Sequence, residues 1–167
     1  SISNDSFGYI NLANNLFDGY RSFERSIGYP LLVAVTGVST DGTLIFLVYI
    51  QALMAISISV LSFYAIRPLG FWYANVAALL ALVNLFPFTM ATQVLTETPY
   101  MFCISLLGFF ACRYFFTKDL VFLLCAVGAT FLLTFVRVSG STQFICLLSG
   151  LVCFMIQNRL KGGRRIK

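Results

Sequence analysis

The chain has 167 residues, of which 59% are hydrophobic and only 10% are charged, and its formal net charge is +5. An average soluble domain is about a quarter charged, and a fold of this size could not hide so much apolar surface from water. The composition therefore excludes an ordinary water-soluble domain. It predicts an all-α fold, a polytopic bundle of transmembrane helices, because lipid accepts apolar side chains on the outside of a protein.

Several chemistries are excluded or unsupported by residue type and spacing. The chain has no histidine, which removes imidazole as a metal ligand or general base. Its five cysteines lie inside apolar runs and form no CxxC pair, so we expect buried thiols. No Walker loop, zinc-ligand spacing, serine triad or dinucleotide fingerprint is present, so soluble nucleotide chemistry is unsupported.

Residues 1–42 are predicted to form an extracytoplasmic loop with short helices that lie in the membrane interface. In residues 5–18, apolar side chains recur at helical spacing among asparagines, and the segment is too short and too polar to span. The apolar run at 31–38 is also too short. Residues 29–40 are therefore expected to form a second interfacial or re-entrant helix, ended by Gly37 and the turn that follows it.

Residues 43–157 are predicted to contain about five membrane spans, and residues 158–167 a basic cytoplasmic tail. Arg67, Pro68 and Gly70 should end the first span. Pro87 lies inside the second and is expected to kink it or end it early. The predicted spans are 43–66, 71–95, 99–116, 120–136 and 141–157.

The basic residues predict the orientation of these spans, because cytoplasmic loops are enriched in Lys and Arg. An alternating path puts Arg21, Arg25 and Arg137 outside, together with every carboxylate except Asp119. We therefore expect an integral membrane protein with its acids on the extracytoplasmic side, and no nucleic-acid partner. The basic residues expected inside are Arg67, Arg113, Lys118, Arg159, Lys161, Arg164, Arg165 and Lys167.

Two acids and one arginine are the main candidates for chemistry. Asp5 begins the first interfacial helix, where a carboxylate either caps the helix or takes a proton from an acceptor hydroxyl. Glu97 is either a loop acid favoured by a helix dipole, or a group that orients a substrate hydroxyl, binds a metal or pairs with Arg137. Arg137 either snorkels to the interface or faces a phosphate, which suits its planar guanidinium.

Other polar residues have more ordinary expected roles. Arg21 and Arg25 are candidates for the same phosphate-binding role as Arg137, against the simpler interpretation of a solvated loop. Thr98 is expected to cap the helix after the polar break, with Pro99 in its first turn. Interhelical hydrogen bonding is the expected role of three amides within the spans. They are Gln51, Asn75 and Asn84.

Four segments together carry a family resemblance. They are Asp5-Ser-Phe-Gly-Tyr-Ile-Asn-Leu-Ala-Asn-Asn-Leu, Ile27-Gly-Tyr-Pro-Leu-Leu-Val-Ala, Val94-Leu-Thr-Glu-Thr-Pro-Tyr and Leu133-Thr-Phe-Val-Arg-Val-Ser-Gly. In order and spacing they resemble the GT-C membrane glycosyltransferases of the protein-mannosyltransferase and aminoarabinose-transferase type. Two positions depart from that pattern: Asn4 stands where many members have a second acid, and Val138 where proline often follows the basic residue.

The resemblance implies a glycosyltransferase of the bacterial inner (plasma) membrane that uses a polyprenyl-phosphate-linked sugar on the extracytoplasmic face, with a lipid, glycan or protein as acceptor. It implies Asp5 as catalytic base and Glu97, Arg137, Tyr29 and Arg25 as substrate-binding residues. A divalent metal at Asp5 and Glu97 is a possibility that the two acids leave open. Since the family's first helix and C-terminal half are missing, we expect a fragment that is inactive alone.

Two other functions remain open. A transporter or flippase would line a path with buried polar residues, although no matching second half is seen. A non-catalytic scaffold subunit would use Asp5 and Glu97 only as helix caps.

Overall fold

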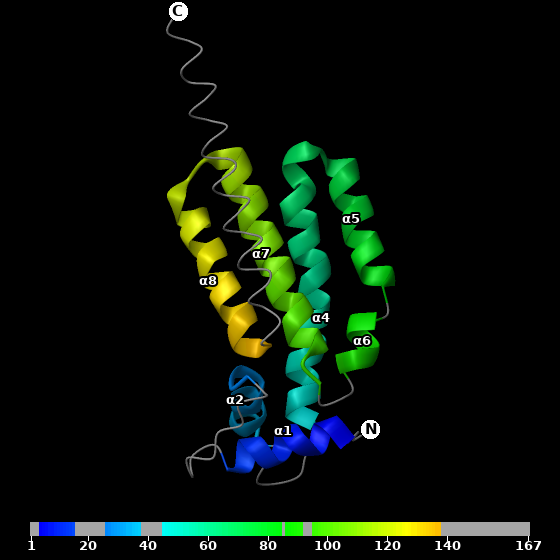
Figure 1. Cartoon of the computed structure of the whole chain (residues 1–167). Coiled ribbons are helices and arrows are strands. Elements are labelled where there is room, and N and C mark those ends of the chain that lie inside the picture. Colours follow the sequence, from blue (N-terminus) through cyan, green and yellow to red (C-terminus); the bar gives the residue numbers. More distant parts are fainter. Residues whose placement is uncertain (1–3, 16–25, 38–44, 85, 92–94, 138–167) are drawn as a thin grey trace, which may run out of the picture.

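The computed structural model describes residues 4–15, 26–37, 45–84, 86–91 and 95–137 (Figure 1). Within these ranges the structure is all-helical, as predicted. The helices are α1 (Asn4–Asn14), α2 (Gly28–Val35), α4 (Ile45–Ile66), the 3-10 turn η1 (Arg67–Leu69), α5 (Phe71–Val83), α6 (Phe86–Ala91), α7 (Glu97–Thr117) and α8 (Leu120–Val136).

Four of these helices run side by side in the order α5, α4, α7, α8 (Figure 1). The turns that join α4 to α5 and α7 to α8 lie at one end of this bundle, at the top of Figure 1. Helices α1 and α2 pack on each other at the opposite end, below α4 and α8. The two ends of the bundle therefore differ: one consists of turns between long helices, and the other is covered by α1 and α2.

The turns at the upper end follow from local backbone chemistry. Pro68 cannot continue the α4 hydrogen-bond ladder, and Gly70 adopts a φ of 135°, which only glycine tolerates well. At the other turn Lys118 ends α7 in the left-handed conformation with a φ of 58°. Asp119 then caps α8, its carboxylate accepting a 3.0 Å hydrogen bond from the Val121 amide.

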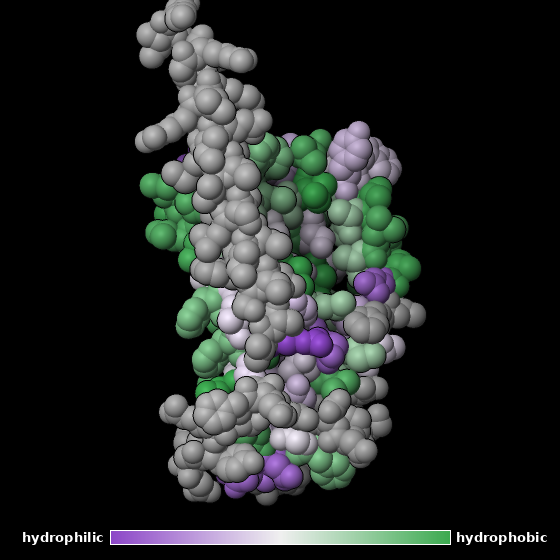
Figure 2. Space-filling view, in the orientation of Figure 1, coloured by the Kyte–Doolittle hydropathy of each residue, from purple (hydrophilic) through white to green (hydrophobic). Residues whose placement is uncertain are grey.

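Among the residues that the structure describes, two helices are long and apolar enough to cross a membrane: the continuous segment Ile45–Leu69, which joins α4 and η1, and α7. In their most apolar stretches only 28% and 6% respectively is buried, whereas a core helix of a soluble protein would be mostly buried. Hydrophobic side chains accordingly cover the outer flanks of α5 and α8 in Figure 2. The shorter apolar helices are α5 and α8.

Some predicted elements are confirmed and others change. The predicted helix at 120–136 coincides with α8, and the third span extends two residues earlier than predicted, to Glu97. The predicted interruption of the 71–95 segment is confirmed, but its position differs: α5 ends at Val83, Asn84 leaves the helical conformation with a ψ of 95°, and Pro87 lies in the first turn of α6. The interruption expected from Pro87 therefore occurs three residues earlier.

Both predicted interfacial segments contain helices. Within the described residues, α1 ends at Asn14, short of the predicted end at residue 18. Helix α2 ends at Val35, and Gly37 follows it with a φ of 74°, as its predicted role as helix stop requires. The predicted fifth span and basic tail lie outside the described residues.

Gly28 is where α2 touches α8, and it generates a stability prediction. A Cβ added there would collide with the Phe135 carbonyl oxygen and come within 2.7 Å of the Phe135 ring. Gly28→Ala should therefore lower the free energy of unfolding by about 1–3 kcal/mol, as overpacking usually does. The measurement is SDS-induced unfolding in mixed micelles, followed by circular dichroism.

Gly128→Ala is the matched control. A Cβ at Gly128 meets no atom within 4 Å, so alanine there should be neutral or add up to about 1 kcal/mol through helix propensity. Equal effects of the two substitutions would contradict the close α2–α8 contact.

Candidate functional site

A buried hydrogen-bond cluster joins α1, α2 and α4 at the lower end of the bundle. Gln51 of α4 is fully buried, and its Nε2 donates to the Tyr29 hydroxyl oxygen at 2.9 Å and to the Leu95 carbonyl at 3.3 Å. The Tyr9 ring of α1 packs edge-on against the Tyr29 ring, with 5.0 Å between centroids. One amide therefore links α2 and α4 to the chain just before α7.

Tyr29 is held as a neutral side chain. Burial raises the pKa of its hydroxyl well above 10, the hydrogen bond from Gln51 opposes that rise, and the nearby Glu97 charge adds to it. The raised pKa means that Tyr29 keeps its proton throughout the physiological range. Tyr29 is therefore equipped to hold a hydrogen-bonded group in place and not to act as a base.

Glu97 and Arg137 form an ion pair where α7 begins and α8 ends. Arg137 Nη1 lies 3.5 Å from Glu97 Oε1, and the side chains are 45% and 28% exposed. The two helix dipoles favour an anion at the first residue of α7 and a cation after α8. The Arg137 guanidinium also lies 5.6 Å from the Tyr100 ring centroid. Of the alternatives open for Glu97, pairing with Arg137 is observed.

The first turn of α7 is capped differently from the prediction. Thr96 occupies the N-cap position without a side-chain cap, and the predicted capping role of Thr98 is wrong. The buried Thr98 hydroxyl instead donates to the Pro87 carbonyl at 3.1 Å, which ties α7 to α6. Pro99 lies in the first turn, as expected, where its missing N–H costs no hydrogen bond.

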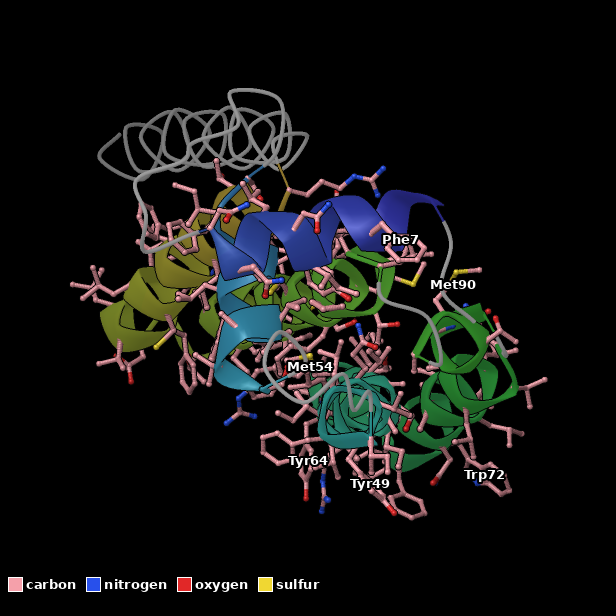
Figure 3. All side chains as sticks on the ribbon, turned by 90° about the horizontal axis from the view of Figure 1, so that it is seen from below. Phe7, Tyr49, Met54, Tyr64, Trp72 and Met90 are labelled. Atoms are coloured by element: carbon pink, nitrogen blue, oxygen red, sulfur yellow. The ribbon has the colours of Figure 1, made fainter. Side chains whose placement is uncertain are left out.

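An apolar cavity of about 390 Å³ lies between α2, α4, α7 and α8. Its walls include Tyr29, Met54, Phe102 and Phe135. In Figure 3 Met54 points inward from α4, whereas Tyr49 and Tyr64 of the same helix point away from the bundle. Pro99 and Val136 also line the cavity, two residues after Glu97 and one before Arg137. Both members of the ion pair are thus close in sequence to residues that line the cavity, although neither is itself a lining residue.

The structure brings together three of the five predicted site residues: Tyr29, Glu97 and Arg137 share the lower end of the bundle. Asp5 lies in α1, whose backbone runs across that same end, but its side chain is outside the described part (Figure 1). Arg25 lies outside the described residues.

Gln51 connects more segments of the chain than its sequence position predicted. Its predicted interhelical hydrogen bonding is confirmed, but its partners were not foreseen. The available signal was a lone amide within a 22-residue apolar helix. The same prediction is wrong for Asn75, whose Nδ2 donates to Phe71 O one turn earlier in its own helix.

The possible divalent metal at Asp5 and Glu97 stays a prediction, because the Asp5 side chain lies outside the described part of the chain. Among the residues that the structure describes, no group of three metal-ligating side chains occurs. Glu97 Oε1 is also engaged by Arg137.

No family model, no curated protein and no solved structure matches the chain.

The Gln51 cluster yields a second stability prediction. Gln51→Leu keeps the side chain large but leaves the buried Tyr29 hydroxyl and Leu95 carbonyl without their donor, which should cost about 1–3 kcal/mol. The readout is again SDS-induced unfolding. Asn75→Leu is the matched control and should change stability by less than about 0.5 kcal/mol, because that amide bonds only within its own helix. A Gln51→Leu variant as stable as this control would contradict the linking role of Gln51.

Proposed function

We propose that this chain is part of a membrane glycosyltransferase of the GT-C type, which moves a sugar from a polyprenyl-phosphate donor to a lipid, glycan or protein acceptor. The observation that carries the proposal is that Arg137, whose side chain is half exposed, directly follows Val136, a residue that lines an apolar cavity. A lipid-linked phosphate has the same two parts, an anionic group and a long apolar chain. Of the residues that the family resemblance selects, Glu97 and Arg137 contact each other, and Tyr29 lies at the same end of the bundle.

The cavity suits the first units of an isoprenoid chain. Its volume of about 390 Å³ lies within the usual range of small-ligand pockets. The side chains that line it are apolar, apart from the Tyr29 hydroxyl and the Cys103 thiol. A chain lying there would bring its phosphate toward Arg137, because Val136 is part of the wall. A planar guanidinium binds phosphate oxygens through two parallel hydrogen bonds.

The proposed reaction needs two tasks from the protein. The acceptor oxygen attacks the sugar carbon from the face opposite the donor phosphate, the carbon–oxygen bond to phosphate breaks, and the electron pair leaves with the phosphate. Arg137 stabilises the charge that gathers there. Asp5 takes the acceptor proton. Glu97 keeps Arg137 in position through the ion pair, and Gln51 and Tyr29 hold α2 against α4 beside it.

The proposal includes a membrane topology. About five spans, of which α4 and α7 are the longest described, place the end with α1, α2, Glu97 and Arg137 on the extracytoplasmic side. The end with Arg67 and Lys118 then faces the cytoplasm, as the positive-inside rule requires. This topology exposes the ion pair to lipid-carried sugars of the outer leaflet of the bacterial plasma membrane.

One observation also favours a scaffold function. The Glu97–Arg137 pair joins the end of α8 to the start of α7 and would stabilise these helices without any chemistry. In that case the two side chains affect folding alone, and donor binding is absent. The two experiments below separate this function from the enzyme.

Arg137→Gln tests the donor site. In the full-length protein it should weaken binding of a polyprenyl-phosphate sugar about 10- to 100-fold, since a hydrogen bond to a charged group contributes roughly 1.5–3 kcal/mol. Arg137→Lys keeps the charge and should lose less. Arg67→Gln, at the opposite end, is the matched control and should bind the donor normally. Unchanged donor binding in Arg137→Gln would refute the phosphate-binding role.

Asp5→Asn tests the catalytic base. Transfer of sugar in the full-length protein should fall by about 100-fold or more, the usual contribution of a positioned base, while donor binding stays normal. Asp119→Asn is the matched control, because Asn caps α8 as well as Asp and lies at the other end. Normal turnover in Asp5→Asn, with normal expression, would remove Asp5 from the catalytic role, whereas no transfer and no donor binding by the unsubstituted protein would favour the scaffold function.

A further inference from the structure

The end of the bundle opposite the candidate site carries three cations that each lie near an aromatic ring. The Arg67 guanidinium carbon is 5.6 Å from the Phe63 ring centroid, and Lys118 Nζ is 4.5 Å from that of Phe115. The Arg113 guanidinium carbon is 5.4 Å from the Phe122 ring centroid. We call this region the basic end. It is defined by Arg67, Arg113 and Lys118 with their ring partners and the exposed aromatic residues Phe71, Trp72 and Tyr73.

Aromatic side chains at the basic end face outward. Trp72 is 80% exposed and Tyr73 is 67% exposed, and Trp72 points away from the bundle in Figure 3. Phe71 packs edge-on against Phe63, which connects these residues to Arg67. Exposed tryptophan and tyrosine beside cations at a helix end are typical of the headgroup level of a bilayer.

The carboxylate at the basic end already has a structural task. Asp119 Oδ1 accepts the Val121 amide hydrogen and caps α8. Arg67 and Lys118 are both exposed beside their aromatic rings, so their positive charge faces outward at this end of the bundle.

We propose that the basic end binds the headgroup phosphates of anionic phospholipids in the leaflet that it faces, preferring them to zwitterionic lipids. Arg67 and Lys118 lie on the two neighbouring turns, so both can approach one lipid surface. Each Lys or Arg side chain near an anionic membrane surface strengthens binding to that surface about fivefold. This surface is independent of the glycosyltransferase proposal, because it lies at the opposite end and uses none of the same residues.

Trp72 makes the proposal testable, because it is the single tryptophan of the chain. The full chain is reconstituted in phosphatidylcholine vesicles that contain a fixed fraction of either brominated phosphatidylglycerol or brominated phosphatidylcholine. Bromine quenches only a neighbouring fluorophore, so Trp72 reports the lipid around the basic end. The expected result is a preference of about fivefold or more for phosphatidylglycerol at low salt, which falls as salt screens the charges.

Variants assign that preference to these residues. Arg67→Gln with Lys118→Gln should abolish it, whereas Arg67→Lys with Lys118→Arg keeps the charges and should retain it. Arg137→Gln removes a charge from the opposite end and should leave Trp72 quenching unchanged. Circular dichroism in the same vesicles checks that each variant is folded.

Three outcomes would overturn the proposal. Equal quenching by both brominated lipids would show no headgroup preference. A preference that survives intact in the folded Gln double variant would place it elsewhere, for example in the basic residues at 159–167. Loss of the preference on adding inorganic phosphate at constant ionic strength would identify a site for free phosphate instead of lipid.

Discussion

Gln51 is fully buried in a largely apolar helix, so the N–H groups of its amide must find acceptors inside the protein. It finds them in the Tyr29 hydroxyl and the Leu95 carbonyl, which belong to segments far away along the chain. An unpaired amide in such surroundings costs several kcal/mol on apolar-transfer scales, so the three segments are strongly favoured to meet there. Once they meet, α2 lies against the bundle and α7 begins beside it.

The arrangement of charge at the lower end follows from that meeting. Glu97 comes two residues after the Leu95 carbonyl that Gln51 holds, and Arg137 ends the helix that packs on α7. The amino-terminal end of α7 favours the negative charge of Glu97, and the carboxyl-terminal end of α8 favours the positive charge of Arg137. The Gly28 contact with Phe135 brings α2 close to α8, and between these helices the cavity remains open. Apolar helices with their polar groups gathered at the ends are what a membrane demands, and they also suit a lipid with a charged head.

The sequence predicted the helices better than the contacts between them. Long apolar runs and breakers such as Pro68, Gly70 and Gly37 act locally, so α7, α8 and the ends of α2 and α4 were close to expectation. The end of α5 before Asn84 was not predicted, because Pro87 was the residue expected to interrupt this segment. The partners of Gln51, Asn75 and Thr98 depend on which helix faces which, and local sequence does not contain that information. The Glu97–Arg137 pair was among the alternatives, because opposite charges near hydrocarbon need partners.

The central claim is that α1, Glu97 and Arg137 share one face of the membrane and that Arg67 and Lys118 share the other. Labelling of single cysteines with a membrane-impermeant maleimide tests it most directly, in full-length protein whose native cysteines are replaced. Cysteines at Asn14 and Arg137, both exposed, should react from outside intact cells, and those at Arg67 and Lys118 only after the membrane is opened. Labelling that puts Asn14 and Arg137 on opposite sides would contradict the account.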